Sequence, residues 1–431
     1  MVIYDVIGVG FGPSNLAVAA AINEDYKNIK AIFIEQKEDF VWHQGMLIND
    51  TTMQISFLKD IATLRNPSSQ YSFLTYLHEE NRLENFANLR TFYPTRIEFN
   101  NYLTWAAKKL NEYVVYSRKV INIYSTNIGS DKIIVVETKN NLTGEIEKRY
   151  SRNIIVACGL SPRYTINYQN KNSKNIFHSA FYLQNIENIN KEESLKFLVV
   201  GGGQSAAEIT KDLHSNFKNS TVTNTFSGFG LKPADDSEFV NEVFCTYSVD
   251  EFYNTNNSVR EQILENHSDT NYAVVDVDLI KELYRINYEE KVLGKKRLIF
   301  NKMTKVISIE ETNNKVIVQS FDKINSKYQL NEYDVVVLAT GYTSNTGVEL
   351  LKNLKDELVL NQNNNIEIDR YYKVKTKKDL GIYSVTGNEL THGLSDTLLS
   401  VLAVRADEIL LNIQASLNSS KLENLKISES A

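Results

Sequence analysis

Cysteine, long apolar runs and positive net charge are scarce or missing in this chain of 431 residues, and each scarcity excludes a class of protein. The two cysteines, Cys158 and Cys245, are too few for a disulfide framework, which indicates a reducing, cytoplasmic compartment. No apolar run approaches the ~18 residues of a membrane-spanning helix. We expect no signal peptide, because a strand-like stretch without a basic leader opens the sequence. With a formal net charge of -6, the chain offers no basic field to nucleic acid.

Motifs for metal binding, phosphate loops and nucleophile turns are also missing. The six histidines are scattered without the spacing of metal ligands, so we predict no metal site. Neither a Gly-x-x-x-x-Gly-Lys loop nor a Gly-x-Ser-x-Gly turn occurs. Hydrophobic residues make up 42% of the chain, which suits a globular core. At roughly 100–200 residues per domain, the length predicts two or three domains.

The start of the chain predicts a nucleotide-binding unit. Apolar strands over 2–7 and 31–36 are separated by a glycine turn and the helix SNLAVAAAINE. This order is typical of a dinucleotide site, because the glycines let the backbone approach a pyrophosphate at the helix N-terminus and the acid after the second strand binds ribose. The residues expected to contact this dinucleotide are Gly8, Gly10, Pro13, Ser14 and Glu35.

A second unit of the same kind follows in KFLVVGGGQSAAEI, residues 196–209. A third strand runs into a glycine turn in DVVVLATGY, residues 334–342. The residues expected at these two turns are Gly201, Gly203, Gln204, Ser205, Thr340 and Gly341. Two nucleotide sites indicate a flavin enzyme that is reduced by a nicotinamide dinucleotide. Disulfide reductases, oxidases and monooxygenases share this plan, and the lack of a closely spaced cysteine pair argues against the reductases.

Other segments predict supporting structure. Alternating residues between 105 and 150 predict a β-meander, and a strand over 154–162 follows it. Near the end of the chain, apolar positions at 398, 399, 402, 406 and 409 predict a helix. The polar residues 416–431 predict a flexible tail.

Two stretches decide between the flavoenzyme classes. GFGPSNLA and the segment from WHQGM to FLTYL, residues 42–77, resemble the flavin-dependent N-hydroxylating monooxygenases of siderophore biosynthesis, which act on the side-chain amines of L-lysine and L-ornithine. The resemblance continues in order through YPTRIEFNNYLTWAA, GLSPRY, GGGQSAAEI, KPADDSEFVNEVF, NYAVV, LATGY and THGLSDTLLSVLAVR. It also accounts for Pro13, because this family ends its flavin turn in Pro-x-Asn-Leu, and proline fits a first helical turn, where no N–H is needed.

The resemblance implies an α/β fold with two Rossmann-like dinucleotide-binding domains, for FAD and NAD(P)H, and a small, mostly helical substrate-binding region. We expect the FAD domain in residues 1–165 and 331–415, the second part including a loop that closes over the substrate. The NAD(P)H domain is expected in 166–330, with a substrate-binding insertion around 232–290. Residues 416–431 remain as the flexible tail.

The resemblance also implies substrate contacts. Lys59 of FLKD is expected to bind the substrate carboxylate, and Asn241 and Asn271 to complete an amino-acid pocket. Ser395, in the loop THGLSDTLLS, is a further expected contact, and Leu394 of that loop is expected beside the flavin. Outside the family context, Lys59 reads as a solvated lysine and the asparagines as turn or capping residues.

Residues around the flavin ring follow from the same resemblance. Trp42, His43 and Gln54 are expected to line the ring, although a plain core position is the rival interpretation for Trp42. Gln54 and Asn271 are the predicted catalytic residues, through positioning of the reactants.

Two positions depart from the family pattern. Ser227 stands where the family places an arginine that grips the 2′-phosphate of NADPH. The missing arginine counts against a preference for NADPH. NADPH is still the expected dinucleotide if Lys232 substitutes for the arginine, and NADH is the alternative. Glu238 stands where the family often has proline. A carboxylate beside the pocket would suit a cationic group, so a diamine such as putrescine or cadaverine stays an alternative substrate, and a plain surface glutamate is the rival interpretation.

The implied reaction consumes NAD(P)H and O2 and converts a primary amine to a hydroxylamine. The amine must be neutral to react, and with a pKa of about 10.4 only about one molecule in a thousand is neutral at pH 7.4, a deficit of about 4 kcal/mol. Partial desolvation in the pocket relieves this deficit, so no strong general base is expected. An NAD(P)H oxidase without amine product and a flavin-based redox sensor stay open as alternatives, and the family resemblance allows a homo-oligomer.

Overall fold

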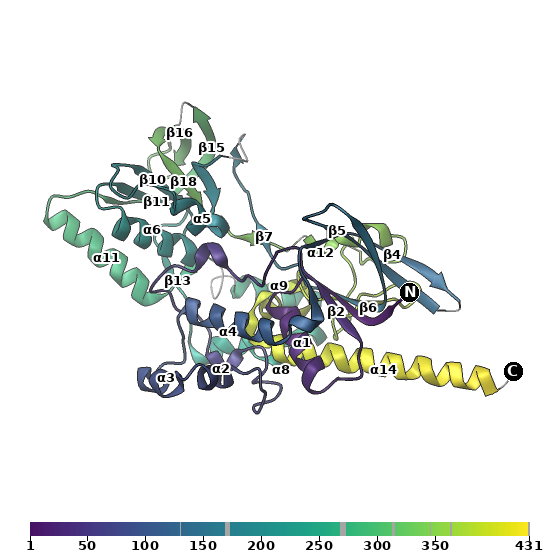
Figure 1. Ribbon diagram of the computed structural model, residues 1–431. Coiled ribbons are helices and arrows are strands. Elements are labelled where there is room, and N and C mark those ends of the chain that lie inside the picture. The colour runs from purple at the N-terminus through teal and green to yellow at the C-terminus, as the bar shows by residue number, and fades with distance from the viewer. Residues whose placement is uncertain are drawn as a thin grey trace.

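The computed structural model describes residues 1–129, 131–168, 173–267, 273–312, 315–344, 346–362 and 364–429. Two sheets, each flanked by helices, dominate the molecule (Figure 1). In Figure 1 the sheet with β10, β11 and β18 lies at the upper left, the sheet with β2, β5 and β6 lies at the right, and a stretch that includes β7 connects them.

The first sheet is built on the N-terminal βαβ unit. Its strand order is β3-β2-β1-β6-β5-β4, and β20 also pairs with β6. The strands β1, β2, β3 and β20 run parallel to their neighbours, as expected for apolar strands covered on both faces. The strands are β1 (Ile3–Val9), β2 (Ala31–Ile34), β3 (Val114–Val115), β4 (Arg118–Ile128), β5 (Asp131–Asn140), β6 (Ile146–Val156) and β20 (Gly381–Ser384).

The predicted meander and the first sheet share one long strand. Strand β6 pairs antiparallel with β5 over its first half and parallel with β1 and β20 over its second half. The segments EIEKRYSRN and IIV, which the sequence separates into a meander strand and a later strand, are therefore continuous. The meander β4-β5-β6 extends the nucleotide-binding sheet.

The second sheet is entirely parallel, in the order β14-β11-β10-β18-β9. Its strands are β9 (Ile176–His178), β10 (Lys196–Val200), β11 (Thr221–Thr225), β14 (Leu298–Asn301) and β18 (Val335–Leu338). The domain boundary expected after residue 330 needs correction, because β18 forms hydrogen bonds with β10 and β9 of this sheet. Sheet pairing therefore moves the boundary beyond Leu338.

Helices cover the inner face of the first sheet. Alanine-rich α1 is buried along its length, between the sheet and the C-terminal helix α14. Helix α4 begins with a capping interaction in which Thr95 Oγ1 accepts from the Glu98 N–H at 3.1 Å. The elements on this side are α1 (Pro13–Glu24), α2 (Phe73–Glu79), α3 (Leu83–Leu89), α4 (Arg96–Lys109), α14 (Leu402–Glu429), η2 (Phe57–Lys59), η3 (Asn111–Tyr113) and η8 (Leu399–Val401).

The second sheet is covered by helices on one face and by a small, mostly antiparallel sheet on the other. The helical face carries α5 (Tyr182–Ile186), α6 (Gln204–Asn216), α11 (Val277–Val292) and η4 (Ser179–Phe181). The opposite face carries β8 (Asn167–Tyr168), β15 (Thr304–Thr312), β16 (Lys315–Asp322) and β17 (Lys327–Tyr333). The far face of the first sheet packs against α12 (Thr346–Leu350) and η6 (Lys352–Leu354).

The region expected as a substrate-binding insertion is mostly helical where the structure describes it. It contains β12 (Lys232–Pro233), α7 (Glu238–Asn241), η5 (Glu242–Phe244), α8 (Thr246–Asn254), α9 (Asn257–Asn266) and β13 (Val274–Val275). Helix α8 contacts α13 (Glu389–His392), and η5 contacts η7 (Leu394–Thr397). The insertion therefore packs against the segment expected to close over the substrate.

The C-terminal residues differ from the sequence prediction. Residues 416–429 were expected to form a flexible tail, yet α14 continues through them to Glu429. Neither glycine nor proline interrupts the helix, and its first part is anchored by Ile409, Leu410 and Ile413 in the core. Each further residue then adds one helical hydrogen bond without a new nucleation step, which favours continuation over fraying.

A segment of the first domain is built into the core of the second. Residues 44–48, which include η1 (Gln44–Met46), place Met46 and Ile48 among the buried side chains around α5 and α6. Gly45 lies against Ala180 of η4 so closely that a Cβ would overlap the Ala180 carbonyl group. The two domains therefore interlock through backbone contact as well as through apolar packing.

This close approach makes Gly45 sensitive to substitution. Because the obstacle is backbone rather than a mobile side chain, Gly45→Ala should destabilise the protein by at least about 2 kcal/mol, as measured by urea unfolding. Gly230→Ala is the control, because no atom lies within 4 Å of its Cβ position, and its stability should stay within about 0.5 kcal/mol of the wild type. Equal stabilities for the two variants would contradict the interlock.

Candidate active site

The first glycine turn has the shape that a dinucleotide requires. Gly10 has a φ of +86°, and a Cβ there would lie 2.5 Å from the Ala157 carbonyl oxygen, so only glycine fits. The turn is tied to the neighbouring strand by the Ala157 N–H, which donates to the Val9 oxygen at 2.9 Å. Gly12, the N-cap of α1, has no atom within 4 Å of its Cβ position. The helix N-terminus is therefore open to an anion such as the pyrophosphate of FAD.

Glu35 follows β2 and faces this turn. Its side chain accepts from the Phe11 N–H at 2.8 Å and from the Lys37 N–H at 3.0 Å. Each carboxylate oxygen retains a lone pair that can accept from a ribose hydroxyl. The position fits the ribose role expected for Glu35.

The second glycine turn repeats the geometry of the first. Gly201 has a φ of +145°, and a Cβ there would overlap the carbonyl of Ala339, the residue after β18. The Ala339 N–H donates to the Val200 oxygen at 2.9 Å. Gly203 is the N-cap of α6, followed by Gln204 and Ser205 in the first turn of that helix. Both turns lie where the strand order of their sheet reverses, which is where ligands bind in such folds.

Two buried asparagines brace the two turns in the same way. The Asn15 amide donates to the Gly10 oxygen at 2.7 Å, and the Asn224 amide donates to the Gly201 oxygen at 2.9 Å. Both side chains are fully buried, and the Oδ1 atom of each finds no partner among the described residues.

Thr340 and Gly341 lie on the connection between the sheets. There β19 (Tyr342–Thr343) pairs with β7 (Ser161–Pro162). The Arg163 N–H donates to the Gly341 oxygen at 2.9 Å, and its Nε donates to the Thr340 oxygen at 3.0 Å. His178 Nε2 also donates to the Gly341 oxygen, at 2.9 Å. These contacts fix the crossing point of the chain between the two nucleotide sites.

Trp42 and His43 stand beside each other at the start of the interlocking segment. The Trp42 ring is half-buried, packs 5.9 Å from Phe99 and lies 4.8 Å from the His43 ring. His43 has a φ of +49°, in the left-handed region. Its side chain reaches solvent, yet the surrounding protein and the charges of Arg96 and Lys37 lower the pKa of His43 to about 4. The Trp42 position fits both a flavin contact and the core interpretation.

Gln54 belongs to a polar chain that reaches the second domain. Gln54 Nε2 donates to Asp276 at 2.9 Å, and Gln204 Nε2 donates to the other Asp276 oxygen at 2.8 Å. Gln204 Nε2 also donates to Glu208 at 2.9 Å. Glu208 forms a two-pronged ion pair with Arg96, with nitrogen–oxygen distances of 2.9 and 2.7 Å.

Lys59 ends the short helix η2, and the neighbouring Asp60 holds this turn in place. The Asp60 carboxylate accepts from the N–H groups of Ala62, Thr63 and Phe73, at 2.9, 2.6 and 2.7 Å. Burial raises the pKa of Asp60, and these hydrogen bonds oppose the shift. Lys59 itself is half-buried, and none of the described residues forms an ion pair with it.

The other expected substrate residues lie on elements that meet. Asn241 ends α7, and the following turn η5 contacts η7, which contains Leu394 and Ser395. Leu394 and Ser395 are buried, at 2% and 1% exposure. The turn of Lys59 contacts η8, the segment directly after η7. Asn271 lies outside the described residues.

The loop after α13 is anchored by a buried arginine. Arg405 of α14 donates to the Asp396 carbonyl oxygen at 2.7 Å and to Ser14 Oγ at 3.1 Å. Asp396 in turn accepts from the Asn388 N–H at 2.8 Å. The closing loop is thereby tied to the first turn of α1, beside the first nucleotide site.

The sequence pointed to the glycine turns and to Lys59, but it did not point to the residues that hold them. The residues that we missed are Asn15, Asp60, Arg96, Glu208, Asn224, Asp276, Asn388, Asp396 and Arg405. Several lie inside quoted stretches, such as FLKD and THGLSDTLLSVLAVR, so the only signal was a charged or amide residue within an apolar context.

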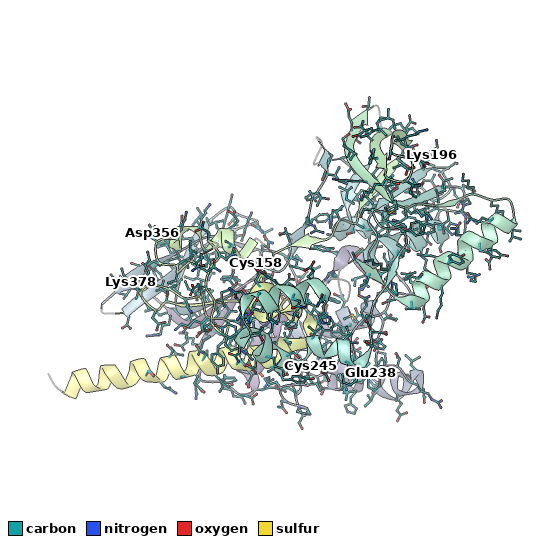
Figure 2. All side chains as sticks on the ribbon, turned by 180° about the vertical axis from the view of Figure 1, so that it is seen from behind. Cys158, Lys196, Glu238, Cys245, Asp356 and Lys378 are labelled. Atoms are coloured by element: carbon teal, nitrogen blue, oxygen red, sulfur yellow. The ribbon has the colours of Figure 1, made fainter. Side chains whose placement is uncertain are left out.

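The described part of the chain holds no group of three metal-ligating side chains, and no helix in it is long and apolar enough to cross a membrane. The thiols Cys158 and Cys245 are both free (Figure 2). Burial and the charge of Glu35 raise the pKa of Cys158 to about 12, which makes its thiol a poor nucleophile.

Comparison with known proteins agrees with this geometry. The family described as L-lysine 6-monooxygenase/L-ornithine 5-monooxygenase matches residues 2–344. The L-ornithine N(5)-monooxygenase of Ajellomyces capsulatus is 38% identical over 96% of this chain and 91% of its own length. That of Pseudomonas aeruginosa is 38% identical over 95% of this chain and 93% of its own. An ornithine N-hydroxylase of Kutzneria sp. 744, solved with reduced FAD, NADP+ and L-ornithine, superposes with a TM-score of 0.92 at 35% identity, over 96% of this chain and 100% of its own. The prediction of two Rossmann-like domains is thereby confirmed.

His392 of α13 supplies a test of the closing segment. Its ring is 1% exposed and stacks on Tyr372 at 4.1 Å, and its Nε2 donates to the Arg370 oxygen at 3.2 Å. Burial, together with the charges of Arg370 and Arg405, lowers the pKa of His392 to about 3. The unfolded chain therefore binds this proton below about pH 6.5, whereas the folded protein does not.

This difference predicts a loss of stability as the pH falls from 6.5 toward 3. At pH 5, protonation of His392 in the unfolded chain alone lowers the free energy of unfolding by about 2 kcal/mol. In urea unfolding at pH 7.5 and pH 5, His392→Gln should lose about 2 kcal/mol less than the wild type between the two values. His78→Gln, which alters an exposed histidine of α2, should keep the wild-type difference. If His392→Gln loses as much stability between pH 7.5 and pH 5 as the wild type does, the His392 ring is not kept neutral by its burial.

Proposed function

The chain belongs to the L-lysine 6-monooxygenase/L-ornithine 5-monooxygenase family, and from this premise we propose that it hydroxylates the side-chain amine of L-ornithine. It is an FAD- and NAD(P)H-dependent N-monooxygenase that uses O2 as its second substrate. The product, an N-hydroxylated amino acid, is a building block for hydroxamate-type siderophores. The similar proteins described above, named as ornithine enzymes, favour ornithine over lysine.

Each cofactor has a turn that fits it. FAD is held at the first turn by Gly8, Gly10, Pro13, Ser14 and Glu35, with Trp42, His43, Gln54, Thr340, Gly341 and Leu394 as further contacts. NADPH is held at the second turn by Gly201, Gly203, Gln204 and Ser205. When bound, the flavin accepts a hydride from the dinucleotide and activates O2, and the protein binds, orients and shields the reactants.

The observation that carries the substrate assignment is the state of Lys59. Lys59 is half-buried and has no carboxylate partner among the described residues, so its ammonium group is available to the carboxylate of a bound ligand. The buried carboxylate of Asp60 holds the turn that presents it. An α-carboxylate of the substrate would supply the missing partner, which favours an amino acid over a diamine.

The other pocket residues bind the remainder of the substrate and position its reacting amine. Asn241 and Ser395 bind the amino-acid portion, and Asn271 positions the reacting amine beside the nicotinamide. The amine has to lose its proton before it reacts, and partial desolvation in the closed pocket favours the neutral form. His43 is neutral at pH 7, because its pKa is about 4, so it adds no positive charge near the flavin. Positioning then supplies most of the catalysis.

The dinucleotide choice rests on the loop after β11. Ser227 is exposed there and lacks the charge of an arginine. The ammonium group of Lys302 lies 3.7 Å from the centre of the Phe229 ring, in the same loop, and the Met303 N–H donates to the Gly228 oxygen at 2.7 Å. The carboxyl ends of parallel strands meet at one edge of a sheet, so we expect Lys302 to be near the 2′-phosphate of a bound NADPH. This arrangement favours NADPH.

A diamine substrate is the second candidate, and Glu238 is the residue that motivates it. Its side chain is exposed at the start of α7 (Figure 2), so it has the environment of a surface carboxylate rather than of a buried ligand for an ammonium group. An oxidase that yields only hydrogen peroxide is the remaining enzymatic alternative. Neither alternative explains the unpaired, half-buried Lys59.

A substrate panel tests the proposal. L-ornithine, L-lysine, putrescine and cadaverine are each incubated with the FAD-loaded enzyme, O2 and either NADPH or NADH, and hydroxylated amine is quantified. We expect the largest kcat/KM with L-ornithine and NADPH. A preference for a diamine would contradict the carboxylate role of Lys59, and peroxide without any hydroxylated amine would favour the oxidase.

Lys59→Ala separates carboxylate binding from the flavin chemistry. Loss of one buried, charge-assisted contact should raise the KM for L-ornithine by a factor of at least about 10. The rate of flavin reduction by NADPH should remain within about 2-fold, because that step involves other residues. Lys119→Ala, an exposed lysine on β4, is the matched control and should keep the wild-type KM. An unchanged KM in Lys59→Ala would refute the assignment.

A further inference from the structure

A chain of polar side chains crosses from the first domain to the second, and we propose that it positions Gln54 for the reaction and couples Gln54 to the dinucleotide turn. The chain consists of Arg96, Glu208, Gln204, Asp276 and Gln54, and we call it the interdomain bridge. Arg96 and Gln54 belong to the first domain, and the other three residues to the second. Asp276, Glu208 and Arg96 are positioning residues in this proposal, since they act through the two glutamines.

Asp276 is the residue that makes the bridge unusual. It is the N-cap of α11, where an aspartate normally accepts from the backbone N–H groups of its own helix. Here it makes no such capping bond. Instead, its two oxygens accept from Gln54 at 2.9 Å and from Gln204 at 2.8 Å. The carboxylate is thus diverted from local stabilisation to a contact between domains.

The bridge fixes which way the Gln54 amide points. An ionised carboxylate can only accept hydrogen bonds, so Gln54 must turn its Nε2 toward Asp276. The Gln54 Oε1 and the second N–H are then directed away from Asp276, where they are available to a ligand. Without Asp276, the amide could rotate by 180° about its last side-chain bond and exchange donor for acceptor.

Asp276 is tied to the dinucleotide turn by two hydrogen bonds, one through its carboxylate and one through its backbone N–H. The Asp276 N–H donates to Gln204 Oε1 at 2.9 Å, in addition to the bond that Gln204 Nε2 makes with its side chain. Gln204 is the first residue of α6, directly after the glycine turn. A Cβ at Gly203 would lie only 3.3 Å from Cα of Ala273, so the chain before Asp276 also packs on this turn. A dinucleotide bound at the turn therefore acts on residues that hold Gln54.

The far end of the bridge is rigid. Glu208 is 4% exposed and forms two parallel hydrogen bonds with the Arg96 guanidinium group. Arg96 is the first residue of α4, and it also donates to the Met46 oxygen at 2.9 Å, within the interlocking segment. Arg96 thus anchors the bridge to a helix of the flavin domain and to the segment that continues to Gln54.

The inference rests on the proposed function, because it assigns a role to Gln54 at the flavin. It predicts that the bridge matters most after the dinucleotide is bound, when Gln54 and the nicotinamide must be aligned. Loss of the bridge should therefore release reduced oxygen as peroxide before the amine reacts, with little effect on ornithine affinity.

Asp276→Ala tests the bridge in the FAD-loaded enzyme. The amount of hydroxylated ornithine formed per NADPH consumed should fall at least 3-fold, with a matching rise in hydrogen peroxide, while the KM for ornithine changes less than 2-fold. A second readout needs no turnover: the change in visible flavin absorption on saturation with NADP+ should shrink at least 3-fold. Asp276→Asn, which keeps one acceptor oxygen and the shape of the side chain, should restore part of both values.

The control is Asp278→Ala, two residues farther along α11. Its carboxylate is 95% exposed and pairs only with Lys281 on the same helix, so both readouts should match the wild type. If Asp276→Ala also matches the wild type in product per NADPH and in the NADP+-induced absorption change, the positioning role is refuted. A lower melting temperature with both readouts unchanged would likewise refute it, because that result indicates a purely structural role.

The two readouts separate this inference from the proposed function. If the wild type forms no hydroxylated amine, the proposed function fails, yet the absorption change on NADP+ binding still reports whether Asp276 links the two sites. If the wild type hydroxylates ornithine and Asp276→Ala behaves normally, the function stands and the bridge is refuted.

Discussion

The ion pair between Arg96 and Glu208 is the contact on which the arrangement of the two nucleotide sites depends. It joins the first turn of α4 to α6 across the domain interface, with both side chains largely removed from water. Breaking such a pair leaves an uncompensated buried charge, which is far less favourable than the loss of an exposed salt bridge. Substitution of either partner alone should therefore destabilise the interface, and the two parallel hydrogen bonds of the intact pair fix how α4 and α6 meet.

Around this pair, the chain threads part of one domain into the other. Met46 and Ile48 fill the core beneath α6, while residues on either side of them, Trp42 and Met53, pack in the core of the flavin domain. Motion of one domain against the other would have to extract these side chains. The segment thus holds the two domains in one relative position. Small shifts of residues at the dinucleotide turn can then reach residues of the flavin domain without a large domain movement.

The two nucleotide sites achieve the same local geometry by different means. In each, a glycine with positive φ lies against the carbonyl of an alanine that follows the adjacent strand, Ala157 or Ala339. In each, a buried asparagine donates to the oxygen of that glycine, but one asparagine comes from the helix after the turn and the other from the next strand. The spacing of the glycines is visible in a sequence, whereas a brace supplied from a distant strand is not.

This contrast explains how much could be predicted. Local patterns identified both βαβ units and the meander, because each depends on periodicity and on turn residues that are close in sequence. The helical insertion was expected only from the family resemblance. The assignment of β18 to the second sheet could not be predicted, because its apolar run DVVVL suits either sheet and only pairing decides. Residues 416–429 were predicted to be a flexible tail because their composition is polar. They are helical because they continue α14, whose earlier turns are anchored in the core. Asp276 and Glu208 were missed because their partners are far away in sequence.

Hydrogen–deuterium exchange of the interlocking segment is the most direct measurement of the central claim, that residues 44–54 join the two domains into one body. The Met46 and Met53 amides donate to the His43 and Pro94 oxygens at 2.8 and 2.9 Å, so both report on the segment. We predict that these amides exchange about as slowly as those of strand β10 in the core of the second domain. Exchange within seconds, while β10 stays protected, would show that the domains move independently and would contradict this account.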